Sequence, residues 1–234
     1  MRKSTKITFI TLGSKLKTQK MITTKACLFD LDGVIVDTAV YHFQAWRRLA
    51  NELGFDFTEH QNEQLKGISR MESLELILEW GNITLSEEKK IEWATRKNAW
   101  YLELVMKMTP NEVLRGVPEF LKALRANGIK IALGSASKNS RLILEKINMV
   151  EYFDVIIDGN NITKGKPDPQ VFLMGAEATN CKPEDCVVFE DALAGVQAGK
   201  AGGMKVIGVG DALILHEADF VIKGFEEMTI DRLF

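Results

Sequence analysis

Two aspartates at the end of an apolar segment are the residues with the clearest chemical meaning in this sequence. The segment LFDLDGVIVDT places Asp30 and Asp32 two positions apart, directly before Gly33, and Asp37 follows. Side chains at i and i+2 of an extended chain point to the same side, so the two carboxylates should lie close together. Close carboxylates repel each other, and such a pair needs a cation or a shared proton.

A second acidic pair, Glu190 and Asp191, ends a later apolar segment. Acids from two strands would form an oxygen-rich site that suits Mg²⁺, which retains several waters and also binds phosphate oxygens. An aspartate held there in its ionised form can attack a phosphate and become an aspartyl-phosphate. Ser135 and Lys166 would complete the phosphate cradle, since phosphoryl transfer depends on positioning and charge neutralisation.

The surrounding segments predict an α/β fold, a doubly wound parallel sheet with a Rossmann-like core. Apolar segments predict strands at residues 26–29, 129–133, 154–157, 187–189, 205–209 and 220–222. Helical patterns alternate with them, and repeated strand–helix units imply a parallel sheet with helices on both faces. Ligands of such sheets bind beyond the carboxyl ends of the strands, where Asp30, Ser135 and Glu190 stand.

Residues 56–106 differ from the rest of the chain, since they are rich in Glu, Lys, Leu and Trp and contain no convincing strand. Ser86, followed by Glu87 and Glu88, indicates a helix start, and the helix should run to about Lys107. We therefore expect an inserted α-helical cap domain at residues 38–107. Residues 21–37 and 108–234 would form the α/β core.

Composition limits the classes of partner. The 234 residues are 46% hydrophobic and 26% charged, with a net charge of −2. This balance gives no reason to expect nucleic acid or an anionic membrane as a partner. No apolar run approaches the roughly 20 residues that span a bilayer.

The N-terminal segment and the cysteines indicate a cytoplasmic protein. Residues 1–20 carry six basic residues and no acid; their short apolar patch leads to no A-x-A-like cleavage site, so we expect a disordered leader rather than a signal peptide. Cys27, Cys181 and Cys186 have neither metal-type nor redox-type spacing, so we expect reduced thiols.

Four motifs together carry a family resemblance. D-x-D-G-x-x-x-D-[ST], a strand-end serine, a lysine before proline and a late E-D pair resemble the haloacid dehalogenase superfamily of phosphotransferases over residues 26–222. The helical insert is similar to the small α-helical cap of that superfamily. The segments FDLDGVIVDTAVYHFQAWRRLA, EQLKGISR, RKN, GSASKN and VFEDALAG more closely resemble its β-phosphoglucomutase family.

This resemblance implies a set of functional residues. Asp30 would be the nucleophile and Asp32 the general acid/base, with Mg²⁺ held by Asp30, the Asp32 carbonyl, Glu190 and Asp191. A small-molecule sugar phosphate would be the substrate. The transferred phosphate would contact Ser135, Ala136 and Lys166, and the other phosphate Arg70, Ser137, Lys138 and Asn139. The cap–core cleft would be lined by His42, Trp46, Lys66, Gly67, Ser69, Ser73 and Lys97.

Two further positions are relevant to the comparison with this family. Thr38, which we group with the substrate-binding residues, stands with Asp37 where the chain leaves the core for the cap, a natural hinge. Met71 is a departure, because the family often has an acid there.

The implied activity is the interconversion of β-D-glucose 1-phosphate and glucose 6-phosphate by a monomer. It would pass through an aspartyl-phosphate and glucose 1,6-bisphosphate. One alternative is a sugar-phosphate phosphatase, and another is a non-catalytic sugar-phosphate binding domain. The intact D-x-D and E-D pairs argue against a silent domain, while RKN at 96–98 and SKN at 137–139 argue against a plain phosphatase.

Purely structural roles also remain open for several of these residues. The two acidic pairs could form a turn and favour a helix N-terminus, and Ser135 could be a helix cap. Lys166, Arg70 and Lys97 could be solvated charges. His42 and Trp46 could be an ordinary helix residue and a packing residue.

Overall fold

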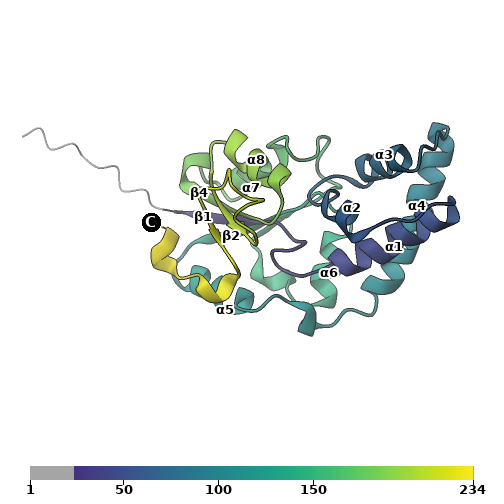
Figure 1. Cartoon of the computed structure of the whole chain (residues 1–234). Coiled ribbons are helices and arrows are strands. Elements are labelled where there is room, and N and C mark those ends of the chain that lie inside the picture. Colours follow the sequence, from purple (N-terminus) through teal and green to yellow (C-terminus); the bar gives the residue numbers. More distant parts are fainter. Residues whose placement is uncertain (1–23, 234) are drawn as a thin grey trace, which may run out of the picture.

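A six-stranded parallel sheet forms the core of the protein. The computed structural model describes residues 24–233, so the expected leader at 1–20 lies outside the described residues (Figure 1). The strands are β1 (Ala26–Phe29), β2 (Lys130–Gly134), β3 (Val155–Ile157), β4 (Cys186–Glu190), β5 (Lys205–Val209) and β6 (Phe220–Ile222). Their order is β3-β2-β1-β4-β5-β6, which confirms the predicted doubly wound sheet.

The register of the central strands aligns their carboxyl ends. Phe29 of β1 is paired with Leu133 of β2 on one side and with Phe189 of β4 on the other. The backbone N–H of Asp30 then donates to the carbonyl of Phe189 at 3.0 Å. The residues that follow these three strands therefore meet at one edge of the sheet.

Helices cover both faces of the sheet, because alternate strand residues are apolar on both sides. On one face, Phe29, Leu133 and Phe189 share a core with α5 (Val117–Ala126) and α6 (Ser140–Lys146). On the other, Leu28 and Val188 pack with α7 (Gln170–Ala178) and α8 (Leu193–Ala201).

The inserted segment is helical, as expected. It contains α1 (Ala39–Glu52), α2 (Glu59–Glu63), α3 (Arg70–Trp80) and α4 (Glu87–Val105). These helices enclose a separate apolar core that includes Trp46, Phe57 and Leu74, and they form the lobe at the right of Figure 1. Ser86 caps α4 by accepting from the N–H of Lys89 at 3.4 Å. We continue to use the boundaries 38–107 for this lobe and refer to it as the cap.

The predicted element boundaries differ from the observed ones by a few residues, as is usual where helix ends fray. The helix expected to reach Lys107 ends at Val105, and the strand expected at 154–157 begins at Val155. Short 3₁₀ helices not predicted from sequence occupy Pro110–Glu112, Val150–Tyr152, Pro183–Asp185, Phe225–Glu227 and Ile230–Leu233.

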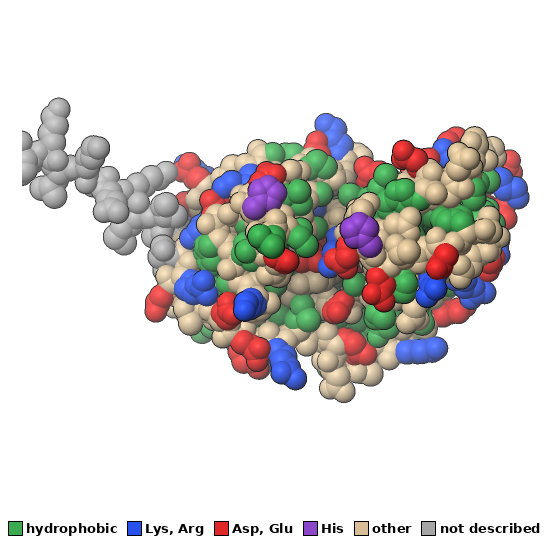
Figure 2. Space-filling model, in the orientation of Figure 1, with side chains coloured by type: hydrophobic (Ala, Val, Ile, Leu, Met, Phe, Trp, Pro, Cys, Tyr) green, Lys and Arg blue, Asp and Glu red, His purple; other side chains and the backbone are tan. Residues whose placement is uncertain are grey.

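The surface and helix lengths bear on the partner predictions. On the face shown in Figure 2, acidic and basic side chains are interspersed over both lobes. Within residues 24–233, no helix combines the length and the apolar character needed to cross a bilayer. The three cysteines are free thiols, as expected.

Candidate active site

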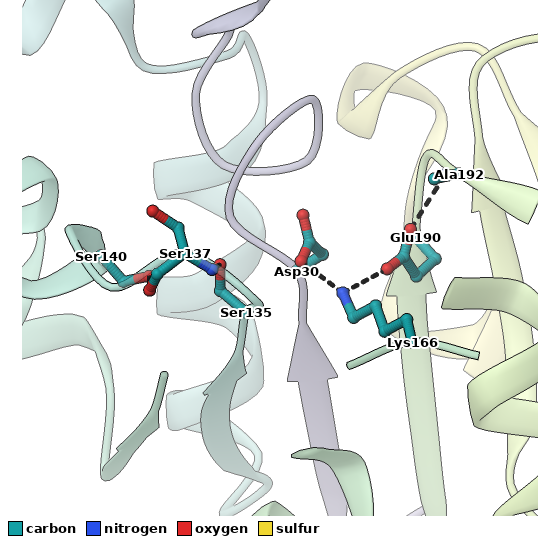
Figure 3. A network of polar contacts seen from close by, with 7 residues as sticks. All are labelled: Asp30, Ser135, Ser137, Ser140, Lys166, Glu190 and Ala192. Atoms are coloured by element: carbon teal, nitrogen blue, oxygen red, sulfur yellow. Dashed lines mark hydrogen bonds and ion pairs between the residues drawn. The ribbon is translucent and has the colours of Figure 1, made fainter. Parts of the chain in front are cut away.

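The predicted reactive residues meet at the carboxyl edge of the sheet. Asp30 follows β1, Ser135 follows β2, and Glu190 ends β4, so the parallel register brings them side by side (Figure 3). All three side chains belong to buried residues, with Asp30 5%, Ser135 1% and Glu190 0% exposed. Lys166 reaches the same point from the loop before α7.

Lys166 is a buried charge held between two carboxylates. Its Nζ lies 2.5 Å from Asp30 Oδ1 and 2.5 Å from Glu190 Oε1, and the residue is only 1% exposed. Burial alone would lower the pKa of Lys166, but the charges of Asp30 and Glu190 outweigh it and hold that pKa above its ordinary value. The interpretation of Lys166 as a solvated loop lysine is therefore wrong.

Asp32 lies in the turn that follows β1. The hydroxyl of Thr38 donates to Asp32 Oδ1, which ties the D-x-D turn to the point where the chain enters the cap. Burial, followed by the nearby negative charge of Asp30, raises the pKa of Asp32 to about 7. A carboxyl group with such a pKa can both donate and accept a proton near neutrality.

The second acidic pair, Glu190 and Asp191, is also largely inaccessible to solvent. Glu190 Oε2 accepts from the backbone N–H of Ala192 at 2.9 Å, so it does contribute to the start of α8, as one structural interpretation suggested. Burial raises the pKa of Glu190 to about 7, with Lys166 opposing and Asp30 reinforcing the shift. Burial and then Glu190 raise the pKa of Asp191 well above its usual value.

Two glycines make room for these acids. A Cβ added to Gly195 would lie 1.8 Å from Glu190 Oε1, and one added to Gly33 would lie 2.1 Å from Asp191 Oδ2. Gly33 also has φ +78°, in the left-handed region that side chains rarely adopt. The closeness of this backbone to the carboxylates thus depends on the absence of a side chain.

The substitution Gly33→Ala should therefore destabilise the protein by about 3 kcal/mol. Left-handed backbone costs an alanine about 1–2 kcal/mol, and the clash with Asp191 adds an overpacking cost of at least about 1 kcal/mol. Gly128→Ala is the matched control, because Gly128 has φ +70° and open space around the added Cβ. Denaturant unfolding would measure both, and equal losses would contradict a specific contact with Asp191.

The donor set is chemically suited to Mg²⁺. Asp30, Glu190 and Asp191 supply carboxylate oxygens, the ligand type that this ion prefers. Burial and neighbouring carboxylates raise the pKa values of Glu190 and Asp191, so their ionised forms are disfavoured here, and a divalent ion would stabilise them. Within the described residues, no group of three or more His, Cys, Asp or Glu side chains is gathered as a ready metal cage, and Lys166 separates Asp30 from Glu190.

A cavity of about 810 Å³ opens above these acids, between the core and the cap. Most of the residues implied by the resemblance line it: Asp30, Asp32, Asp191, Thr38, His42, Trp46, Lys66, Gly67, Ser69, Arg70, Ser73, Lys97, Ser135, Ala136, Ser137, Lys138 and Asn139. Lys166 and Glu190 are not among the lining residues, but Lys166 contacts Asp30, which lines the cleft, and Glu190 in turn contacts Lys166. We call this cavity the cleft.

The cap side of the cleft contains a buried cation. Lys97 is 2% exposed, and its Nζ lies 3.0 Å from His42 Nδ1 and 4.1 Å from the centroid of the Trp46 ring. Burial, and then the charge of Arg70, hold the pKa of Lys97 well below its ordinary value. Burial followed by Lys97 likewise lowers the pKa of His42. The interpretation of Lys97 as a surface charge is therefore wrong.

The loop after β2 is built to present polar groups to the cleft. Ser135 Oγ accepts from the N–H of Ser137 at 3.1 Å, and Ser137 Oγ accepts from the N–H of Asn139 at 3.2 Å. Ser140 Oγ donates to the carbonyl of Ser137 at 2.8 Å. The N-cap of α6 is Asn139, so Ser135 does not cap that helix. Across the cleft, Arg70 begins α3, and burial lowers its pKa.

Several lining residues were not predicted from sequence, including Asn62, Glu72, Asn98, Tyr101 and Lys164. Two of them carry a detectable signal. Asn98 and Tyr101 follow Ala94 and Lys97 at helical spacing, so one face of α4 turns toward the cleft. Tyr101 lies one helical turn after Lys97, and Asn98 directly follows Lys97 in the RKN segment.

Comparison with known proteins defines the class of enzyme. A family model for haloacid dehalogenase-like hydrolases matches residues 24–203. Because the match covers most of the chain and the strand-end acids have the geometry just described, the chain belongs to the haloacid dehalogenase-like hydrolase family.

Its relatives within that family include phosphomutases and a phosphatase. Beta-phosphoglucomutase of Bacillus subtilis is 42% identical over 211 residues, covering 89% of this chain and 93% of the relative. The crystal structure of beta-phosphoglucomutase from Clostridium difficile matches with a TM-score of 0.87 and 42% identity, covering 90% and 96% of the two chains. A phosphorylated carbohydrates phosphatase of Thermotoga maritima is 32% identical, covering 78% and 83%. The chain is thus a β-phosphoglucomutase-like phosphotransferase, which confirms the predicted fold and enzyme class.

Proposed function

We propose that this protein is a Mg²⁺-dependent phosphomutase that interconverts β-D-glucose 1-phosphate and glucose 6-phosphate. The observation that carries the proposal is that two groups of cationic and hydrogen-bonding residues, each suited to a phosphate, lie at one cleft. Asp30, Ser135 and Lys166 form the first at its floor. Arg70, Lys138 and Asn139 line the same cleft and would form the second.

Asp30 would attack the phosphorus and carry the phosphoryl group as an aspartyl-phosphate. Lys166 would neutralise the charge of the transferring group, and Ser135 would hydrogen-bond to it. Both are fixed for this role, Lys166 by its ion pairs and Ser135 by the N–H of Ser137. Such pre-positioned charge is the main requirement of phosphoryl transfer.

Asp32 would move protons at the sugar. It would protonate the departing sugar oxygen in one step and accept a proton from the attacking hydroxyl in the other. The hydrogen bond from Thr38 holds its carboxylate in the lining of the cleft. The cap would exclude water, which would otherwise hydrolyse the aspartyl-phosphate.

Mg²⁺ would be held by Asp30, Glu190, Asp191 and the Asp32 carbonyl. When bound, it would neutralise phosphate charge and keep Asp30 ionised. The raised pKa values of Glu190 and Asp191 support this assignment, because a bound cation would favour the ionised forms that burial opposes.

A mutase needs two phosphate sites because its intermediate carries two phosphates. Glucose 1,6-bisphosphate must turn over in the cleft and return its other phosphate to Asp30. A phosphatase needs only the site at the floor. The volume of about 810 Å³ is ample for a hexose bisphosphate, because small-molecule sites span roughly 300–1,000 Å³.

One experiment tests the proposal directly. The protein would be incubated with Mg²⁺, a trace of glucose 1,6-bisphosphate and β-glucose 1-phosphate, and both glucose 6-phosphate and free phosphate would be followed. We expect glucose 6-phosphate as the main product. Free phosphate as the main product would support the sugar-phosphate phosphatase instead, an alternative that the similarity to the Thermotoga maritima phosphatase favours.

The remaining predictions belong to the same proposal. The intact acidic residues at the strand ends argue against a non-catalytic sugar-phosphate binding domain. The interspersed surface charge offers no site for nucleic acid on the face seen in Figure 2. We propose a monomer that acts in the cytoplasm on a small-molecule sugar phosphate.

Arg70→Ala should lower turnover of glucose phosphates by about 10- to 100-fold, because a guanidinium can donate two charge-assisted hydrogen bonds to a phosphate. Phosphorylation of Asp30 by a small acyl phosphate should change less than about threefold, since that donor has no second phosphate. Arg141→Ala, at an exposed arginine of α6, is the control. Equal losses with the two donors would remove Arg70 from a distal phosphate site.

A further inference from the structure

A side-chain contact joins cap helix α4 to the core residues of the proposed second phosphate site. Asn139 Nδ2, in the loop after β2, donates to Asn98 Oδ1, in α4 of the cap, at 2.9 Å. The two residues are 41 positions apart, and both line the cleft. We call this contact the Asn98–Asn139 pair.

The backbone around Asn139 is firmly held by the core. Its N–H donates to Ser137 Oγ at 3.2 Å, and Asn160 Nδ2 donates to the carbonyl of the neighbouring Lys138 at 3.1 Å. The N–H of Gly159 donates to the carbonyl of Ser137 at 3.2 Å. These hydrogen bonds fix the backbone of the loop after β2, so the side-chain amide of Asn139 is the part that can still change its orientation.

That amide is oriented from the cap. An asparagine side chain has one acceptor oxygen and one NH₂ group with two donors, so the contact with Asn98 fixes which end of Asn139 faces which way. Among the residues that the structure describes, Asn139 Oδ1 and Asn98 Nδ2 have no hydrogen-bond partner. Both are therefore available to a ligand in the cleft.

We propose that Asn98 is a positioning residue that orients Asn139 only when the cap is closed. The inference rests on the proposed mutase function. Its consequence is that the second phosphate site is complete only in the closed molecule. Opening of the cap breaks the pair, frees the bisphosphate intermediate to turn, and admits water. Closing restores the pair and favours transfer to sugar over transfer to water.

Asn98→Leu tests this, because leucine has the same number and branching of side-chain heavy atoms as asparagine and no polar atom. The protein would turn over β-glucose 1-phosphate with Mg²⁺ and trace glucose 1,6-bisphosphate, and the ratio of free phosphate to glucose 6-phosphate would be measured. We expect the ratio to rise about fivefold, the effect of losing one hydrogen bond of about 1 kcal/mol. Asn51→Leu is the control, since Asn51 is exposed on cap helix α1 and its side chain makes no hydrogen bond within residues 24–233.

A double-mutant cycle separates positioning from a general effect on the cap. In an Asn139→Leu background, Asn98→Leu should change the ratio less than twofold, because its partner is already gone. Thermal unfolding of each variant checks that it is folded, and Asn98→Ala repeats the test with a smaller side chain.

The possible results distinguish a failure of the role of Asn98 from a failure of the proposed mutase function. Wild-type protein that forms no glucose 6-phosphate would overturn the mutase proposal. Wild-type protein that isomerises, with an unchanged ratio in Asn98→Leu or an equal effect in both backgrounds, would overturn the role of Asn98 alone.

Discussion

Asp30→Asn should reduce turnover of glucose phosphates by at least about 10⁴-fold, since removal of a covalent nucleophile typically has an effect of this size or larger. The substitution keeps the volume of the side chain and removes its negative charge. A carboxamide cannot replace the carboxylate as a nucleophile toward phosphorus. It also deprives Lys166 Nζ of the charge that lies 2.5 Å away.

Two measurements check this prediction. The first is the rate of glucose 6-phosphate formation. The second is the intact mass of the protein after exposure to a small acyl phosphate with Mg²⁺, which should show one added phosphoryl group in the wild type and none in the variant. Asp231→Asn, at an exposed carboxylate remote from the cleft, should retain activity within about twofold. Turnover by Asp30→Asn within tenfold of the wild type would rule out Asp30 as nucleophile.

Lys166→Met should lower the free energy of unfolding by about 3–5 kcal/mol, because it leaves buried carboxylates without their cation. Asp30 and Glu190 both contact Lys166 Nζ at 2.5 Å, and Glu190 is fully buried. For a chain of this length, such a loss corresponds to a melting temperature lower by roughly 10 °C or more. Activity should fall as well, since the transferring phosphate would lose its neutralising charge.

Mg²⁺ supplies a second, independent readout. The ion should raise the melting temperature of Lys166→Met more than that of the wild type, because it would balance carboxylates that Lys166 otherwise neutralises. Lys164→Met is the matched control, since the side chain of Lys164 is 71% exposed and its unfolding free energy should change by less than about 0.5 kcal/mol. A melting temperature of Lys166→Met equal to that of the control would show that the buried ion pairs contribute little.

Much of the fold was readable from local patterns. Short apolar strands and amphipathic helices alternate, and a parallel sheet is the arrangement that buries both. The same logic located Asp30, Ser135 and Glu190 at strand ends, because the carboxyl ends of parallel strands meet at one edge. The helical character of the cap was equally visible, whereas its division into α1 to α4 was not fully resolved.

Other features depend on contacts between distant segments. Lys166 and Asp30 are 136 positions apart, and nothing around Lys166 in the sequence distinguishes a buried ion pair from a solvated lysine. Lys97 is similar, since its burial depends on how α4 packs against His42 and Trp46 of α1. The Asn98–Asn139 pair exists only because the cap lies over the core.

The amino-acid sequence thus determined the architecture and the identity of the reactive groups, since secondary structure and sheet edges follow from short-range apolar periodicity. The burial of Lys97 and Lys166, the raised pKa of Asp32 and the cap–core contact of Asn98 came from the assembled molecule. Burial and electrostatic coupling are properties of the space around a side chain. The residues that surround such a side chain are distant from it in the sequence, and nothing in the sequence indicates that they are neighbours in the fold.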